Sequence, residues 1–379
     1  MHFCPNPDCA YRGWVGWGNL RANGHPNGGP WRQLLCVVCH HYFLETLGTL
    51  FHGKRASVDL IVHVIGCLAE GLGIRGTARV FEVDPNTVLQ WLVEAADQLR
   101  AFSCHFLHNV RVTQVQLDEL FALLSAIKDG AVNEAEAIER LERVPHWVWV
   151  AMDPESKLLL ALDVGDRTLA MAQRVVHHVA QVLAPDCAPL FLTDGFREYL
   201  TALLTHYGQW VQPARQRAQG PAPKPRWMPL PQLLYAQVIK TVRRRRLVRV
   251  SHRVVFGTLK AVLAALAVSL VSAVVNTVFL ERHNGSDRNR NRRKVRKTCC
   301  SSKDWGVHEA MTYFTMYSYN FCWPVRTLRV QVGKREYEQR TPAMAAGLAD
   351  HVWTIQEWAG YPALKRLRDG QSGLQPRQT

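Results

Sequence analysis

A helical pattern of hydrophobic residues runs from residue 57 to about residue 102. Leu60, Val64 and Leu68 share one face of a first helix, and a glycine-rich break separates it from a second helix over 74–81. The spacing therefore predicts a pair of helices joined by a short connection.

A third helix is predicted to begin after Asp84, whose side chain can cap a helix that has Pro85 at its first position. The polar residues Thr87, Gln90 and Glu94 then face outward. A helix, a short turn and a capped second helix are the parts of a helix-turn-helix, whose second helix enters the major groove of DNA. Many helical hairpins bind nothing, so the pattern alone leaves both interpretations open. The apolar residues expected in the buried stripe are Val88, Leu92, Ala95 and Leu99.

From residue 111 onward the hydrophobic period becomes two, which is typical of strands. Strands and one helix in alternation predict a mixed α/β core. Two inserts interrupt it, an acidic helix-like piece over 133–143 and a proline-rich basic stretch over 213–231 that we expect to be an extended linker or loop. The predicted strands cover 112–118, 146–152, 157–164 and 189–193, and the predicted helix covers 168–183.

The longest apolar run covers residues 261–275 and contains two serines. It falls short of the roughly 18–20 residues that span a bilayer. We expect a buried helix there and no membrane segment. The first ten residues do not form a secretory signal, so a cytoplasmic location in a prokaryotic cell is expected.

Composition excludes a disordered or fibrous chain, because 379 residues with 47% hydrophobic and 20% charged residues are typical of two or three globular domains. The net charge of +15 indicates a polyanionic partner. Residues 199–303 carry 21 basic and 2 acidic side chains, whereas the rest of the chain sums to −4. One strongly basic segment on a nearly neutral body favours nucleic acid over a membrane surface.

Four cysteines fall in two pairs near the start of the chain, in CPNPDC and CVVC. Paired thiolates on two turns can complete a tetrahedral zinc site, and the glycine-rich segment between the pairs needs such a metal for stability. The first pair has a wider spacing than usual, so His2, His40 or His41 could replace one thiolate, and unligated thiols are the alternative to a zinc ribbon. The expected ligands are Cys4, Cys9, Cys36 and Cys39.

Three acids stand out by position. Asp118 follows the first alternating stretch, Asp194 ends a short apolar strand within FLTDG, and Glu281 lies between the apolar run and a basic tract. Carboxylates at the ends of neighbouring strands and on a facing helix can hold two Mg²⁺ ions for phosphodiester chemistry. Acids that merely cap turns are the alternative.

The order CPNPDC…CVVC, GIRGTARVFEVDPNTVLQWL, VQLDEL, FLTDG and FLERHN…RKVRKTCCSSK resembles transposases of the insertion-sequence-one family over about residues 3–323, with the regulatory and catalytic reading frames joined in one chain. The tail TPAMAAGLADHVWTIQEW also resembles single-frame relatives. The resemblance implies a DDE transposase with an RNase H-like catalytic core.

By the resemblance, Asp118, Asp194 and Glu281 are the catalytic acids and hold Mg²⁺ or Mn²⁺. Glu119 competes with Asp118 for the first position, and we prefer Asp118 because alternation places it opposite the apolar residues. Asn284 and Arg288 continue the motif that begins at Glu281 in ERHN. The partner is double-stranded DNA, the element ends and the target, held by at least a dimer. The residues expected to contact DNA are Arg75, Arg79, Thr87, Gln90, Arg282, Asn284, Arg288 and Arg292.

The predicted domains are a zinc ribbon over 1–52, a helix-turn-helix over 56–104, a catalytic core over 110–325 and a tail over 326–379. The core has inserts at about 129–144 and 208–235. Two other functions are open: a DNA-binding regulator with an inactive core, and a metal-dependent nuclease without strand transfer. Cys299 and Cys300 have no predicted role.

Overall fold

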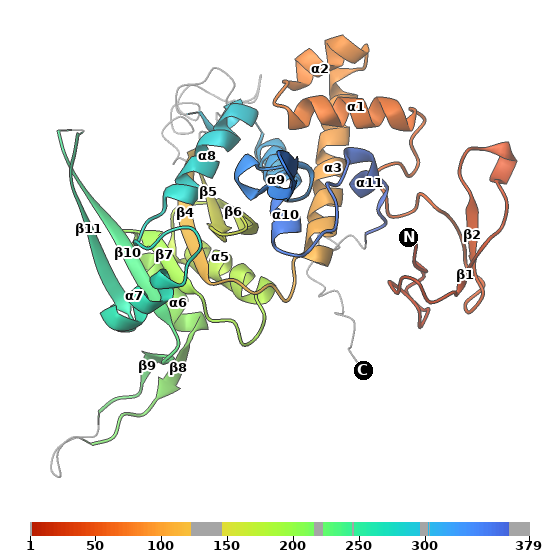
Figure 1. Cartoon of the computed structure of the whole chain (residues 1–379). Coiled ribbons are helices and arrows are strands. Elements are labelled where there is room, and N and C mark those ends of the chain that lie inside the picture. Colours follow the sequence, from red (N-terminus) through yellow and green to blue (C-terminus); the bar gives the residue numbers. More distant parts are fainter. Residues whose placement is uncertain are drawn as a thin grey trace, which may run out of the picture. The chain divides into compact units, whose positions relative to one another are not determined.

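The computed structural model describes residues 2–122, 146–215, 223–244, 246–295, 302 and 304–363 (Figure 1). These form two compact units. The described residues of the first unit come from 1–106, 313–318 and 353–379, and those of the second come from 107–312 and 319–352.

The first unit begins with a small antiparallel sheet of β1 (Leu20–Ala22), β2 (Gln33–Cys36) and β3 (Tyr42–Leu44), with a short 3₁₀ turn, η1 (Pro26–Gly28), between the first two strands. Its buried apolar residues are few. A sheet with so little core requires further stabilisation.

Three helices follow, α1 (Val58–Ala69), α2 (Ile74–Phe81) and α3 (Pro85–Phe106). Asp84 Oδ1 accepts a hydrogen bond of 2.8 Å from the backbone N–H of Asn86, so the predicted cap of α3 is present. Glu82 adopts a left-handed conformation with φ 54° and turns the chain between α2 and α3. The predicted stripe of α3 is at most 1% exposed, at Val88, Leu92, Ala95 and Leu99.

Part of the C-terminal region completes this helical unit. Trp353 and Tyr361, on either side of α11 (Ile355–Gly360), place their rings against Phe102, with centroid distances of 4.8 and 5.4 Å. Gln98 Nε2 donates a hydrogen bond of 2.6 Å to the carbonyl of Tyr361. Sequences more than 240 positions apart therefore share one core.

The second unit is built on a six-stranded mixed sheet, which confirms the predicted mixed α/β class. In order across the sheet the strands are β11 (Arg246–Phe256), β10 (Leu234–Arg243), β7 (Leu190–Asp194), β4 (Gln114–Ala122), β5 (His146–Met152) and β6 (Leu159–Gly165). Strands β4, β5 and β6 form an antiparallel meander, β7 pairs in parallel with both β4 and β10, and β11 closes one edge.

The strand predictions agree with this sheet except at β4 and beyond β7. Strand β4 continues to Ala122, so Asp118 lies inside the strand and does not follow it. The alternation in the sequence extends only to Asp118, whereas pairing with β5 continues the strand to Ala122. The sequence pattern does not predict strands β10 and β11, because four consecutive arginines, residues 243–246, stand where the two strands meet.

Helices cover both faces of the sheet. α5 (Leu169–Val182) packs on β5 and β6, and α6 (Glu198–His206) packs on α5. α8 (Val278–Arg290) packs on β4. Because successive side chains of a strand point to opposite faces, β4 offers Gln116 and Asp118 to one face and Glu119 to the other.

The prediction of a buried helix over 261–275 is wrong. Helix α7 covers only Leu259–Ala267, and Leu270 is 81% exposed. Only Val262 and Leu266 are buried in this helix, against Leu190, Leu192 and Ala236. One short stripe of α7 therefore packs on β7 and β10, and apolarity of the sequence overstated burial. No helix in the described part of the chain is long and apolar enough to cross a membrane.

The proline-rich insert is only partly extended linker. β8 (Gly208–Val211) and β9 (Arg226–Pro229) lie at its two ends and pair as an antiparallel hairpin, in which Trp210 is opposite Trp227. Residues 216–222 lie outside the described residues, as does the acidic insert over 133–143.

After α8 the chain forms η2 (Arg292–Lys294) and α9 (Trp305–Cys322). The ammonium of Lys294 is fully buried and pairs with Asp287 at 2.7 Å. The amide of Asn320 bonds both backbone groups of Leu159 at 2.9 Å and ties α9 to the sheet. The remaining elements are η3 (Arg326–Leu328), β12 (Val330–Gly333), β13 (Glu336–Glu338) and α10 (Pro342–Ala345).

Candidate metal sites

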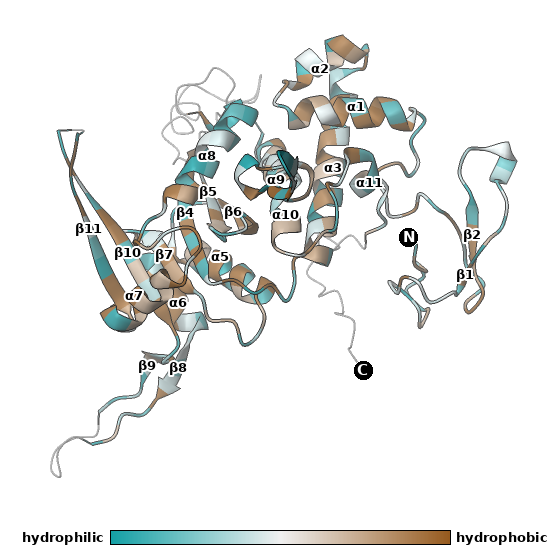
Figure 2. Ribbon diagram, in the orientation of Figure 1, coloured by the Kyte–Doolittle hydropathy of each residue, from teal (hydrophilic) through white to brown (hydrophobic). Residues whose placement is uncertain are grey.

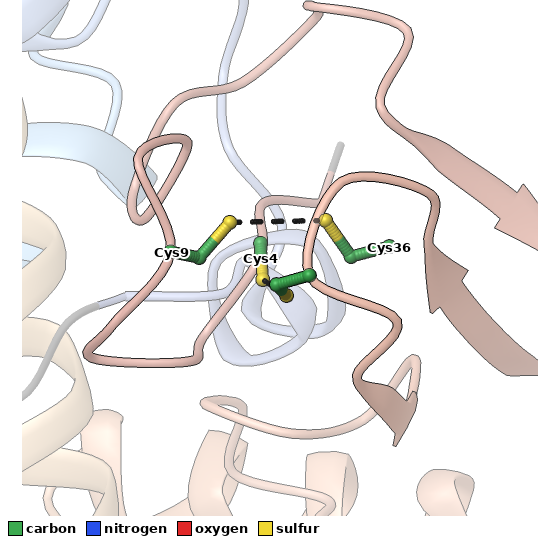
Figure 3. Close-up of side chains that lie close together, drawn as sticks. Cys4, Cys9 and Cys36 are labelled. Atoms are coloured by element: carbon green, nitrogen blue, oxygen red, sulfur yellow. Dashed lines mark hydrogen bonds between the residues drawn. The ribbon is translucent and has the colours of Figure 1, made fainter.

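The two cysteine pairs lie on opposed turns of the first unit (Figure 3). The first turn is closed by hydrogen bonds from Cys9 N–H to the Asn6 carbonyl at 3.1 Å and from Gly13 N–H to the Cys4 carbonyl at 3.3 Å. The second follows β2, where His40, with φ 55°, donates its N–H to the carbonyl of Cys36 at 2.8 Å. Both turns direct their thiols inward.

The four sulfur atoms have the spacing of a tetrahedral site. All lie within 4.8 Å of one another, with Sγ–Sγ distances of 3.5 Å between Cys4 and Cys39 and 3.9 Å between Cys9 and Cys36. Four thiolates about 2.3 Å from one zinc ion would be about 3.8 Å apart, so these residues fit the metal. The group contains no histidine, so the structure favours four thiolates over His2, His40 or His41.

Hydrogen bonds prepare one of these thiols to ionise. Burial would raise the pKa of Cys36, but the backbone N–H groups of Cys39 and Val38 and the amide of Asn19 lower that pKa to about 6. Asn19 Nδ2 lies 3.4 Å from the Cys36 sulfur. Burial raises the pKa of Cys4. Asn19 was not among the predicted residues, because nothing local distinguishes it from other loop asparagines.

Parallel pairing of β4 with β7 brings two predicted acids together in the second unit. Leu117 is in register with Thr193, so the next residues, Asp118 and Asp194, lie side by side on the same face. Carboxylate oxygens of Asp118, Glu119 and Asp194 lie within 4.8 Å of one another. Oxygen donors at this spacing suit Mg²⁺ or Mn²⁺.

The cluster is electrostatically unfavourable without a cation. Burial and then the charge of Asp194 raise the pKa of Asp118 to about 6, and Glu281 adds to the effect. Burial and Asp194 likewise raise the pKa of Glu119 to about 7. Neighbouring carboxyl groups whose pKa values are raised by burial and by one another's charge are typical of sites that bind a cation or transfer a proton.

Helix α8 approaches the cluster from the Asp118 face of the sheet. Gln116 anchors its start, accepting a hydrogen bond of 3.1 Å from Leu280 N–H and donating one of 2.9 Å to the Asn276 carbonyl. Asn284 is buried and donates from Nδ2 to Asp118 Oδ2 at 3.0 Å. Asn284, which follows Glu281 in the segment FLERHN, therefore contacts Asp118 directly.

Glu281 lies near this cluster without belonging to the closely spaced group. Its side chain is 42% exposed, accepts a hydrogen bond of 2.8 Å from Thr277 and pairs with Lys240 of β10. Glu119, by contrast, is 1% exposed and pairs with Arg167 at 3.0 Å. The structure thus brings together Asp118, Glu119 and Asp194 more closely than the predicted set.

Gln116, Arg167 and Lys240 were not predicted, and no short motif in the sequence identifies them. Lys240 lies 41 positions from its partner Glu281, on a strand that was not predicted. Arg167 lies in the turn before α5 and stacks over the rings of Trp147 and Phe196.

The remaining predicted DNA contacts are distributed over two units. In the first, Arg75, Arg79 and Gln90 are exposed, whereas Thr87 is half-buried and Gln90 donates to Glu94 at 2.9 Å. In the second, Arg282 and Arg292 are exposed and Arg288 is half-buried, one turn after Asn284 on α8. Cys299 and Cys300 lie outside the described residues.

No family model matches the chain. No curated protein matches it either. A chain from the crystal structure of the Mos1 strand transfer complex is similar at 16% identity over 39% of this chain and 54% of that one, with a TM-score of 0.15. Our chain thus spans about half the length of that chain. At this TM-score the similarity supports no conclusion about fold or function.

Proposed function

We propose that the protein is a DNA transposase of the insertion-sequence-one family with an RNase H-like catalytic core. The observation that carries the proposal is the parallel register of β4 and β7, which aligns Asp118 with Asp194 beneath the helix that bears Glu281 and Asn284. An antiparallel meander followed by two parallel strands, with the acids on the central pair, supports this type of core.

The chain's own residues hold and position the reacting groups. Asp118, Asp194 and Glu281 are the metal ligands of the proposal, and Asn284 orients the Asp118 carboxylate. Two Mg²⁺ or Mn²⁺ ions bound there would activate the attacking oxygen and stabilise the leaving oxygen in phosphodiester displacement. Water would hydrolyse the phosphodiester bond at the element end and leave a 3′-hydroxyl there. That hydroxyl would then attack a target phosphodiester and displace the target strand's own 3′-oxygen, which leaves as a 3′-hydroxyl.

The first unit supplies recognition in this proposal. The group of four cysteines, Cys4, Cys9, Cys36 and Cys39, would hold Zn²⁺ and stabilise the zinc ribbon. Helices α2 and α3 would form the helix-turn-helix that binds the inverted terminal repeats. Thr87 and Gln90 would read base edges, and Arg75 and Arg79 would bind phosphates. Arg282, Arg288 and Arg292 would bind phosphate near the carboxylates.

A cleavage and strand-transfer assay tests the function. Wild-type protein, DNA carrying the element's ends and Mg²⁺ should give both cut ends and joined products. Asp118→Ala, Asp194→Ala and Glu281→Ala should each abolish both products, while the matched exposed-acid control Glu336→Ala retains them. Full activity in any of the three variants contradicts that residue's role. Cleavage without joining would instead identify a nuclease, and DNA binding without cleavage would identify a regulator.

A further inference from the structure

Strands β10 and β11 extend well beyond the sheet that supports them (Figure 1). β10 pairs with β7 only over Leu234–Val238, while its pairing with β11 continues to the turn between Arg243 and Arg246. We call the part beyond Val238 the ribbon: residues 239–244 and 246–251. Nearly every described residue of the ribbon is exposed, and neither of its strands has a further described sheet neighbour there.

The pairing register sorts the side chains of this hairpin onto two faces. Partners in an antiparallel pair lie on the same face, and faces alternate along each strand. Arg253 is paired with Gln237, Arg249 with Thr241 and Arg246 with Arg243. Gln237, Thr241 and Arg243 are even numbers of residues apart and share one face of β10. A bulge in β11 between Leu247 and Arg249 keeps Arg246 and Arg249 on that same face, which therefore carries a row of arginines. The members of this arginine row are Arg243, Arg246, Arg249 and Arg253.

The opposite face is different in character. Val242 is paired with Leu247, and Lys240 with Val250. Val242, Leu247 and Val250 are 59%, 58% and 47% exposed. The hydropathy colouring accordingly shows hydrophobic and hydrophilic residues mixed along both strands (Figure 2). Substitutions of the arginines on one face therefore test charge, and substitutions of the valines on the opposite face test whether any change in the hairpin has the same effect.

Nothing in the described structure neutralises the arginine row. All four side chains are exposed, and none of them pairs with a described acidic residue. The sequence contains no Asp or Glu from residue 199 to residue 280. Four cations on one face repel one another, which favours a polyanion as their ligand.

The dimensions of the row fit a nucleic acid backbone. Arg246 and Arg253 lie seven residues apart on β11, which corresponds to about 24 Å at roughly 3.4 Å per residue. That length covers about seven base pairs, and the major groove of B-DNA, about 12 Å wide, admits a two-stranded ribbon. Val238, at the base of the ribbon, is in register with Asp194, so the ribbon leads away from the carboxylate cluster.

We propose that the arginine row binds the phosphates of duplex DNA and that the ribbon is a second DNA-contacting arm, separate from the helix-turn-helix. This inference rests on the proposed function. Its contacts are to phosphate and therefore carry no sequence preference.

Salt-dependent binding tests the arm. The triple variant Arg243→Gln/Arg246→Gln/Arg249→Gln is compared with the matched control Arg326→Gln/Lys334→Gln/Arg335→Gln, which removes the same charge from exposed positions of the same unit. Full-length proteins are titrated onto labelled duplexes, with and without the element end, between about 50 and 300 mM salt. A second control, Val242→Ser/Val250→Ser, alters only the opposite face.

In the arginine variant, log affinity should fall less steeply with log salt, with the magnitude of the slope reduced by about 2–3. Binding at low salt should weaken on the order of tenfold, equally on both duplexes. Both controls should keep the wild-type slope. Equal effects of the arginine variant and the charge control would overturn the inference, as would an equal effect of the valine variant or binding of anionic vesicles in place of duplex.

The two proposals fail separately. A wild-type protein that cleaves and joins DNA, but whose ribbon variant behaves like the control, retains the proposed function and loses the arm. A wild-type protein with ribbon-dependent binding but no Mg²⁺-dependent cleavage retains the arm and loses the function. Absence of duplex binding by the wild-type protein would overturn both.

Discussion

Glu119 shows how far a single side chain can depart from its sequence pattern. Alternation placed Asp118 on the polar face and left Glu119 as its competitor, yet Glu119 is the more buried of the two. Arg167 neutralises it, with a guanidinium nitrogen 3.0 Å from the Glu119 carboxylate. A strand that is covered on both faces offers no solvent face, so period-two alternation cannot choose between adjacent acids.

The raised pKa values predict a pH effect on stability. Ordinary carboxyl pKa values near 4 apply to the unfolded chain, so the folded state binds more protons between about pH 4 and pH 7. Stability from Asp118 and Glu119 is therefore present below about pH 4 and is lost as pH rises through about 6 and about 7. Glu119→Gln should remove roughly 3 kcal/mol of this dependence.

Thermal melting of metal-free protein between about pH 5 and 8 measures the effect. Glu198→Gln, a change in an acid that is paired near the surface of α6, is the matched control and should follow the wild-type curve. An identical pH dependence in wild type and Glu119→Gln would contradict the assigned shift.

At the scale of elements, the small sheet of the first unit depends on its cysteines. Its strands have three or four residues each, too few to form a stable core alone. The thiol cluster brings the turn at Cys4 to the turn that follows β2. A metal bound there would hold together two segments that few buried apolar residues connect.

We expect about one zinc ion per chain in the full-length protein. Cys36→Ser should lose the metal and lower the melting temperature of the first unit, whereas Cys104→Ser, an exposed cysteine outside the cluster, should retain it. Metal analysis by mass spectrometry, together with melting in the presence of a chelator, measures both. Full stability of Cys36→Ser without zinc would show that the fold of the first unit does not depend on a metal held by these thiols.

Helix α3 separates its packing face from its outer face along one element. Val88 and Leu92 are fully buried, while Gln90 is exposed. Gln90→Ala should therefore leave the melting temperature within about 1 °C and change which terminal-repeat bases are preferred, because side-chain amides recognise base edges.

Binding to a library of repeat variants measures that preference. Asp97→Ala, on the same helix but far from its first turn, should not change it. If Gln90→Ala weakens all sequences equally, Gln90 contacts phosphate or none of the DNA.

At the scale of the whole molecule, the charge is divided more sharply than the total of +15 suggests. The basic segment supplies β10, β11 and α8, elements that surround or extend from the carboxylate cluster. A nearly neutral remainder leaves the electrostatic attraction for a polyanion concentrated there.

The proposed function requires two DNA ends in one complex, so this proposal predicts at least a dimer when end DNA is bound. Sedimentation of full-length protein with labelled end duplexes should give a species with two chains and two ends. Duplexes of scrambled sequence are the control and should not give paired ends. A complex with one chain and one end under all conditions would contradict the expectation.

Local features were predictable where local physics decides them. The Asp84 cap, the start of α3 at Pro85 and the bounds of β5 depend on residues that are neighbours in sequence. Strands β10 and β11 could not be predicted from the four arginines at 243–246, because like charges on paired strands are unfavourable. The pairing of β10 with β7 supplies the alignment that the local sequence lacks.

Composition and short-range periodicity were enough to predict helices α1–α3 and α5, strands β4–β7, the buried stripe of α3, the four-cysteine group and the basic segment. Tertiary packing, in contrast, brings Glu119 to Asp118 and Asp194, pairs Lys240 with Glu281, and leaves only Val262 and Leu266 of the apolar run over 261–275 buried. These depend on strand register and on how much surface each neighbour covers. Such quantities arise between residues distant in sequence, and no local pattern encodes them.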